Sequence, residues 1–158
     1  MDLMVIGDPH AHPDYDNSRF EKLGKFIAKV KPDAVVCMGD FADMPSLSSY
    51  DRGTKGFEGR RYQKDIDAAL DAQARLLHPL KRMKNLKRYM VMGNHEDRIV
   101  RVTNSSPELD GAIGIKDLKY KENGWKVTPF KKSLKIKNIM FSHYFSSGIM
   151  GRPISSVH

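Results

Sequence analysis

Polar side chains of the kinds that bind metal ions follow three short apolar runs in this sequence. Each run ends at a glycine, and the polar residues come directly after it. The apolar run 3–6 is followed by Asp8 and His10, and the run 34–38 is followed by Asp40 and Asp43. The run 89–92 is followed by Asn94, His95, Glu96 and Asp97. Open α/β sheets place their sites at the carboxyl ends of strands. The three runs therefore predict strands that deliver these residues to one site.

The residue types at these positions favour a transition-metal centre. Asp8 and His10 are spaced so that both can reach one cation, and Asp40 can bridge two ions through its two oxygens. Asn94 offers a neutral carbonyl oxygen, and His143 offers a nitrogen after a further predicted strand. Mixed nitrogen and oxygen ligation suits Mn, Fe or Zn better than Ca or Mg. Any one of these residues alone could equally be a turn or capping residue, so the prediction depends on the whole set.

Hydrophobic periodicity predicts an α/β domain around these positions. A strand, a helix and a second strand within the first 38 residues form a βαβ unit. A long loop follows the second strand, and loops of that length are usually functional. The predicted strands are 2–6, 34–38, 88–92, 126–130, 133–137 and 138–142, the predicted helices are 18–31, 60–83 and 95–102, and the loop is 43–59.

Composition limits the class of protein. The chain has 158 residues, 40% of them hydrophobic and 29% charged, which is typical of one globular domain. Its single cysteine, Cys37, excludes a disulfide framework, and no apolar run is long enough for a signal peptide or membrane span. We therefore expect a cytoplasmic protein. The net charge of +8 favours anionic partners, although most basic clusters have the spacing of solvated helix ends and strand faces.

Four motifs in this order resemble the calcineurin-like metallophosphoesterase family: Asp8-x-His10, Gly39-Asp40-x-x-Asp43, Gly93-Asn94-His95-Glu96 and a later His143. The resemblance implies a β-sandwich flanked by helices, with two divalent metal ions (Mn, Fe or Zn) at the strand ends. It assigns Asp8, His10 and Asp40 to one ion and Asp40, Asn94 and His143 to the second. It makes His95 the general acid or the residue that steadies the phosphate, and Asp43 the residue that orients it. Arg98 and His12 are weaker candidates for substrate contact.

The family's final Gly-His-x-His motif is not present in the sequence. We therefore expect residues 1–158 to be a single domain truncated at its C-terminus, with an incomplete second sheet. An exposed sheet edge of that kind invites self-association. His158 lacks the preceding Gly-His pair and is not expected to be a ligand.

The expected activity is hydrolysis of a phosphate ester by a dinuclear metal centre, in which a bridging hydroxide attacks and His95 acts as general acid. Met44 and Pro45 follow Asp43 where the protein-phosphatase branch has Arg-Gly, which disfavours that branch. The short chain resembles small bacterial and bacteriophage members, so a phosphodiester, nucleotide or nucleic acid (a nuclease) is the favoured substrate. The alternative is a catalytically impaired binding module of the same fold that contacts nucleic acid through its basic surface.

Overall fold

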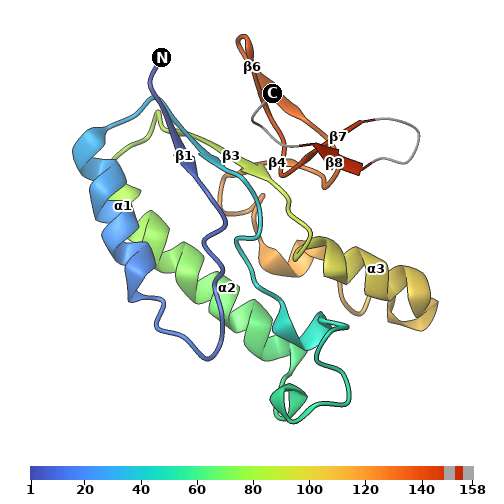
Figure 1. Cartoon of the computed structure of the whole chain (residues 1–158). Coiled ribbons are helices and arrows are strands. Elements are labelled where there is room, and N and C mark those ends of the chain that lie inside the picture. The colour runs from blue at the N-terminus through green and yellow to red at the C-terminus, as the bar shows by residue number, and fades with distance from the viewer. Residues whose placement is uncertain (148–151, 155–158) are drawn as a thin grey trace.

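A four-stranded parallel sheet forms the centre of the protein in the computed structural model (Figure 1). The structure describes residues 1–147 and 152–154. The strands lie in the order β1 (Leu3–Ile6), β2 (Ala34–Cys37), β3 (Lys87–Val91) and β4 (Lys126–Thr128), and each neighbouring pair is parallel. All four carboxyl ends therefore lie at one edge of the sheet, as the βαβ prediction requires.

Two helices cover one face of this sheet (Figure 1). They are α1 (Ser18–Val30) and α2 (Tyr62–Leu77), and they pack against each other as well as against the strands. A 3-10 turn at His78–Leu80, which contains Pro79, ends α2. The predicted helix 60–83 is thus shorter, because a proline cannot donate the hydrogen bond that would continue it. The core on this face includes Phe20, Ile27 and Leu76.

A hairpin covers the opposite face and forms the second layer of the sandwich. It consists of β5 (Leu134–Ile136) and β6 (Ile139–Phe141), which are antiparallel. Side chains alternate between the faces of a strand, so Val35 and Cys37 join the helix-side core while Val36 packs with Ile136 and Phe141. A second short pair, β7 (Phe145–Ser147) and β8 (Arg152–Ile154), follows. The prediction of a helix-flanked metallophosphoesterase-type fold is confirmed.

The second layer covers only part of its face. Val5 on β1 and Ile139 and Met140 on β6 each expose about half of their surface. An incomplete second layer was predicted; self-association through an exposed edge stays a prediction. Within the described residues, no helix is long and apolar enough to span a bilayer.

Two further elements differ from the predictions. The strand predicted at 126–130 is shorter, since β4 spans Lys126–Thr128, and it pairs in parallel with β3 at the edge of the first sheet. A three-residue strand carries too little pattern to show which sheet it joins. The third helix, α3 (Asp97–Ser105), begins two residues later than predicted because residues 94–96 form the turn that holds the candidate site. The long loop and residues 107–118 contain short 3-10 turns at Pro45–Leu47, Lys55–Phe57, Pro107–Leu109 and Ile115–Leu118.

Candidate metal centre

The turns after β2 and β3 touch each other at two glycines. Gly39 has φ +102° and Asp40 has φ +47°, so the chain turns sharply directly after β2. A Cβ on Gly93 would overlap Asp40 Oδ1 and lie 2.5 Å from the Asp40 backbone nitrogen. Only glycine fits this contact. The two turns thereby hold Asp40, which is 4% exposed, in the middle of the candidate site.

Asp8, His10 and Asp40 form the first candidate ligand group. One ligand atom from each lies within 4.8 Å of the others. The loop after β1 is held beside the loop after β2, because the His10 N–H donates to the Asp40 carbonyl at 3.0 Å and the Ala11 N–H donates to the Phe41 carbonyl at 2.6 Å. These three residues, from two strand ends, were predicted to share one ion, and the structure brings them together.

Asp40, Asn94 and His143 form the second group. His143 Nδ1 lies 2.8 Å from the Met38 carbonyl, a contact in which Nδ1 carries the proton. His143 Nε2 then presents a lone pair, and it lies 2.8 Å from Asn94 Oδ1 and 3.6 Å from Asp40 Oδ2. Carboxylate, amide and imidazole acceptors that converge in this way fit a shared cation. The donor atoms of both groups are therefore of the kinds that hold divalent metal ions, and Asp40 belongs to both groups.

Asp43 holds two histidines in one orientation. Its Oδ1 lies 2.9 Å from His10 Nδ1 and 2.7 Å from His95 Nδ1. A carboxylate that accepts from one ring nitrogen fixes the tautomer and leaves the other nitrogen free to bind a metal or substrate. Burial alone raises the pKa of Asp43, but the hydrogen bonds from His95 and His10 outweigh it and lower that pKa to about 2. His10, Asp43 and His95 are also close enough to hold an ion themselves.

His95 lies between the metal ligands and a guanidinium. Its backbone N–H donates to Asp40 Oδ1 at 2.9 Å, and its Nε2 lies 3.0 Å from Arg98 Nη2. Arg98 also donates to the carbonyls of Asp43 and Met44. Burial lowers the pKa of His95, but the hydrogen bond to Asp43 and the charge of Asp40 outweigh it, so the pKa is raised above its ordinary value.

The weaker candidates occupy different positions. Arg98 lies at the site, where it contacts His95 and no carboxylate among the described residues. The side chain of His12 is mostly buried, with Nε2 3.5 Å from Asp43 Oδ2. It lies behind Asp43, so a contact with substrate stays a prediction. His158 lies outside the described residues.

Glu96 lies in the predicted motif, but the sequence did not indicate that it positions the other residues of the site. It is fully buried, and its two oxygens accept hydrogen bonds from the backbone N–H groups of Asp40 (3.0 Å), Ala42 (3.0 Å) and Gly93 (2.9 Å) and from the Tyr120 hydroxyl (3.0 Å). Burial raises the pKa of Glu96. This carboxylate ties the turns after β2 and β3 together and so positions the metal ligands. Its place directly after His95 was the only signal in the sequence for this role.

Comparison with known proteins agrees with this geometry. A family model described as calcineurin-like phosphoesterase matches residues 1–158. The Gene 54 protein of Mycobacterium phage L5 is 31% identical over 98 residues, which make up 62% of this chain. The match spans 37% of the length of the phage protein.

Proposed function

Because the chain belongs to the calcineurin-like phosphoesterase family, we propose that it is a metal-dependent phosphoesterase with a two-ion site. The observation that carries this proposal is that two ligand groups share Asp40, with Asp8 and His10 in one group and Asn94 and His143 in the other. When bound, two divalent cations would polarise a phosphoryl group and lower the pKa of the attacking water. Mn, Fe and Zn suit this donor set best.

The residues around the ligands have distinct tasks in this proposal. Asp43 binds the Nδ1 atoms of His10 and His95, so the Nε2 atoms of both rings are directed away from it. His10 Nε2 would then face a metal ion, and His95 Nε2 would face the leaving group. Against the effect of burial, the hydrogen bond to Asp43 and the charge of Asp40 raise the pKa of His95, which favours the protonated ring that a general acid needs. In the present arrangement His95 Nε2 faces an Arg98 N–H, so donation to the substrate requires that Arg98 turns to a phosphate oxygen.

A phosphodiester in a nucleotide or nucleic acid is the proposed substrate. The +8 net charge supports an anionic polymer over a neutral ester. Arg98 supplies a cation directly beside His95, where it would neutralise a phosphate oxygen.

The experiment compares turnover of two diesters with Mn²⁺ added, one with a nitrophenyl leaving group and one with an alkyl leaving group. Asp40→Asn is expected to abolish both reactions, whereas Asp110→Asn, at an exposed position, is expected to leave both unchanged. His95→Asn should slow the alkyl ester by roughly 10²- to 10⁴-fold and the nitrophenyl ester less, because nitrophenolate needs little protonation. Absence of metal and turnover in the wild-type chain, together with nucleic-acid binding, would replace this proposal with the non-catalytic binding module.

A further inference from the structure

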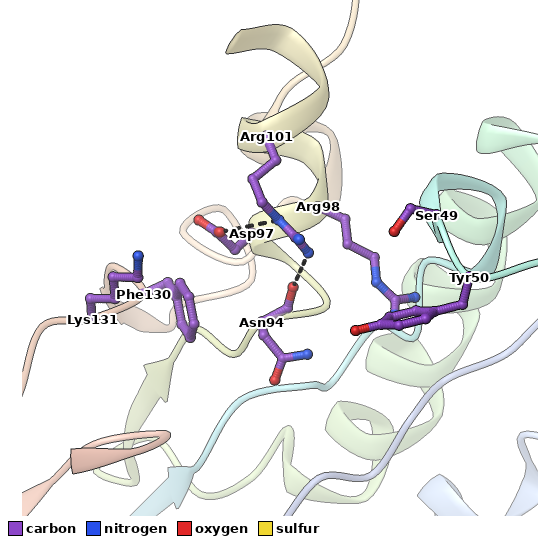
Figure 2. A pocket seen from close by; sticks show the side chains of 8 residues that line it. All are labelled: Ser49, Tyr50, Asn94, Asp97, Arg98, Arg101, Phe130 and Lys131. Atoms are coloured by element: carbon purple, nitrogen blue, oxygen red, sulfur yellow. Dashed lines mark hydrogen bonds and ion pairs between the residues drawn. The ribbon is translucent and has the colours of Figure 1, made fainter. Parts of the chain in front are cut away.

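A pocket of about 300 Å³ opens beside the candidate metal centre and shares Asn94 with it (Figure 2). Arg98 and Arg101 of α3 point into it, with Asn94 below them. Phe130 and Lys131, which follow β4, lie on one side, and Tyr50 of the loop after β2 lies on the other. Three segments that are far apart in the sequence thus meet next to the residues proposed to bind the reacting phosphate.

The pocket carries an excess of positive charge. It is lined by three cations, Arg98, Arg101 and Lys131, and by one carboxylate, Asp97. Asp97 Oδ2 lies 3.5 Å from Arg101 Nε. Arg101 Nη2 is not used by this ion pair and donates to the Asn94 backbone carbonyl at 3.3 Å. The other two cations have no carboxylate partner among the described residues. A phosphate group would satisfy this charge.

Two aromatic rings stand on opposite sides of the same pocket. Tyr50 is 89% exposed, which leaves its ring face available. Phe130 is held more firmly, since its ring centroid lies 6.1 Å from that of His143 and 5.4 Å from that of Tyr144. Tyr50 therefore offers an exposed aromatic face beside cations, which is the combination that binds an unpaired base and its phosphate.

We infer that this pocket binds the nucleotide adjacent to the reacting phosphodiester of a single-stranded nucleic acid. The inference rests on the proposed function, because the position of the reacting phosphate at Asp40, Asn94 and His143 fixes where the strand must pass. From Asn94 the strand runs into the pocket, where its next phosphate meets Arg101 and Lys131 and its base stacks on the exposed ring of Tyr50.

The size and lining of the pocket select a single strand. A volume of about 300 Å³ is at the lower limit of small-molecule sites, enough for one nucleotide unit. Bases in a duplex are stacked on each other and cannot present their faces to Tyr50, whereas unpaired bases can. A nucleoside monophosphate has only one phosphate, so it cannot place one phosphate at the metal centre and another beside Arg101 and Lys131.

The test measures binding of fluorescein-labelled oligothymidylate by fluorescence anisotropy with Mn²⁺ present and with His95→Asn in every protein, so that the metal ions are kept and hydrolysis is slow. Tyr50→Leu is expected to weaken binding by roughly five- to one-hundredfold, and Tyr50→Phe to restore it, because stacking needs the ring and not the hydroxyl. Arg101→Gln is expected to reduce the slope of log affinity against log salt by about 0.7. The matched control is Arg82→Gln, which removes the same charge from an exposed position outside the pocket.

Equal weakening by Arg101→Gln and Arg82→Gln would overturn the inference, because binding would then reflect net charge alone. So would unchanged affinity in Tyr50→Leu, tighter binding of the duplex than of the single strand, or full competition by thymidine monophosphate at concentrations comparable with the oligonucleotide. Thermal unfolding of each variant confirms that the fold is kept. Turnover of the nitrophenyl diester, measured separately, reports on the proposed function, so failure of catalysis and failure of this pocket are distinguishable.

Discussion

Replacing Glu96 tests whether one buried carboxylate holds the two ligand-bearing turns together. In Glu96→Ala the backbone N–H groups of Asp40, Ala42 and Gly93 lose their acceptor while they stay buried. An unpaired buried donor costs about 1–3 kcal/mol. Three such donors at the lower limit cost about 3 kcal/mol in free energy of unfolding, which corresponds to a fall of roughly 6–12 °C in Tm for a domain of this size.

Glu96→Gln distinguishes the contribution of the Glu96 hydrogen bonds to stability from the contribution of its charge. Its amide oxygen can replace Oε2 and accept from Asp40 and Gly93, while its NH₂ group faces the Tyr120 hydroxyl, which can reverse and accept. Only the Ala42 N–H is then unpaired, and removal of a buried charge offsets part of that loss. Glu96→Gln should therefore be clearly more stable than Glu96→Ala.

Thermal unfolding of both variants and of Glu122→Ala, at an exposed position, measures these differences. Manganese titration of the same proteins shows whether the metal site depends on Glu96: we expect Glu96→Ala to bind Mn²⁺ much more weakly and Glu122→Ala to bind it like the wild type. A Glu96→Ala variant that unfolds within about 1 °C of the wild type and binds Mn²⁺ normally would refute the reasoning.

Two further substitutions test the close contact at Gly93 and the buried carboxylate of Asp65. Gly93→Ala should abolish manganese binding in a titration, because its Cβ would overlap Asp40 Oδ1, whereas Gly56→Ala, with nothing closer than 3.7 Å, should bind normally; equal binding by both would contradict the contact. Burial raises the pKa of Asp65, so its contribution to stability is lost as pH rises through that raised pKa. Asp65→Asn can still accept the Ser46 N–H and should stabilise the protein in urea unfolding at pH 7, with a gain that shrinks as the pH falls toward 3.8. An equal gain in free energy of unfolding at pH 7 and at pH 3.8 would show that the charge of Asp65 is not the cause.

The sequence predicted the parts of the fold that depend on local pattern. The four-residue apolar runs of β1 and β2 indicated strands, and a glycine after each run marked the turn, although Val5 on β1 is half exposed. Hydrophobic periodicity likewise indicated the helices α1 and α2, which supply Phe20, Ile27 and Leu76 to the core. The grouping of the candidate ligands was predictable for the same reason, because parallel strands place their carboxyl ends together.

Long-range contacts explain what the sequence did not show. The role of Glu96 depends on its burial between two turns and on Tyr120, which is 24 residues away. The sheet that β4 joins depends on its pairing with β3, which three residues do not encode. The cationic pocket combines Tyr50, Arg101 and Phe130 from three separate segments, and no spacing rule connects them.

The number of metal ions bound per chain tests the central claim most directly. Isothermal titration with Mn²⁺, checked by elemental analysis of the dialysed protein, should give two ions for the wild type. His143→Ala should retain one, because its imidazole belongs only to the second group, and Asp40→Asn should lose both. Binding of a single ion by the wild type, or two ions still bound by Asp40→Asn, would contradict a two-ion centre organised around Asp40.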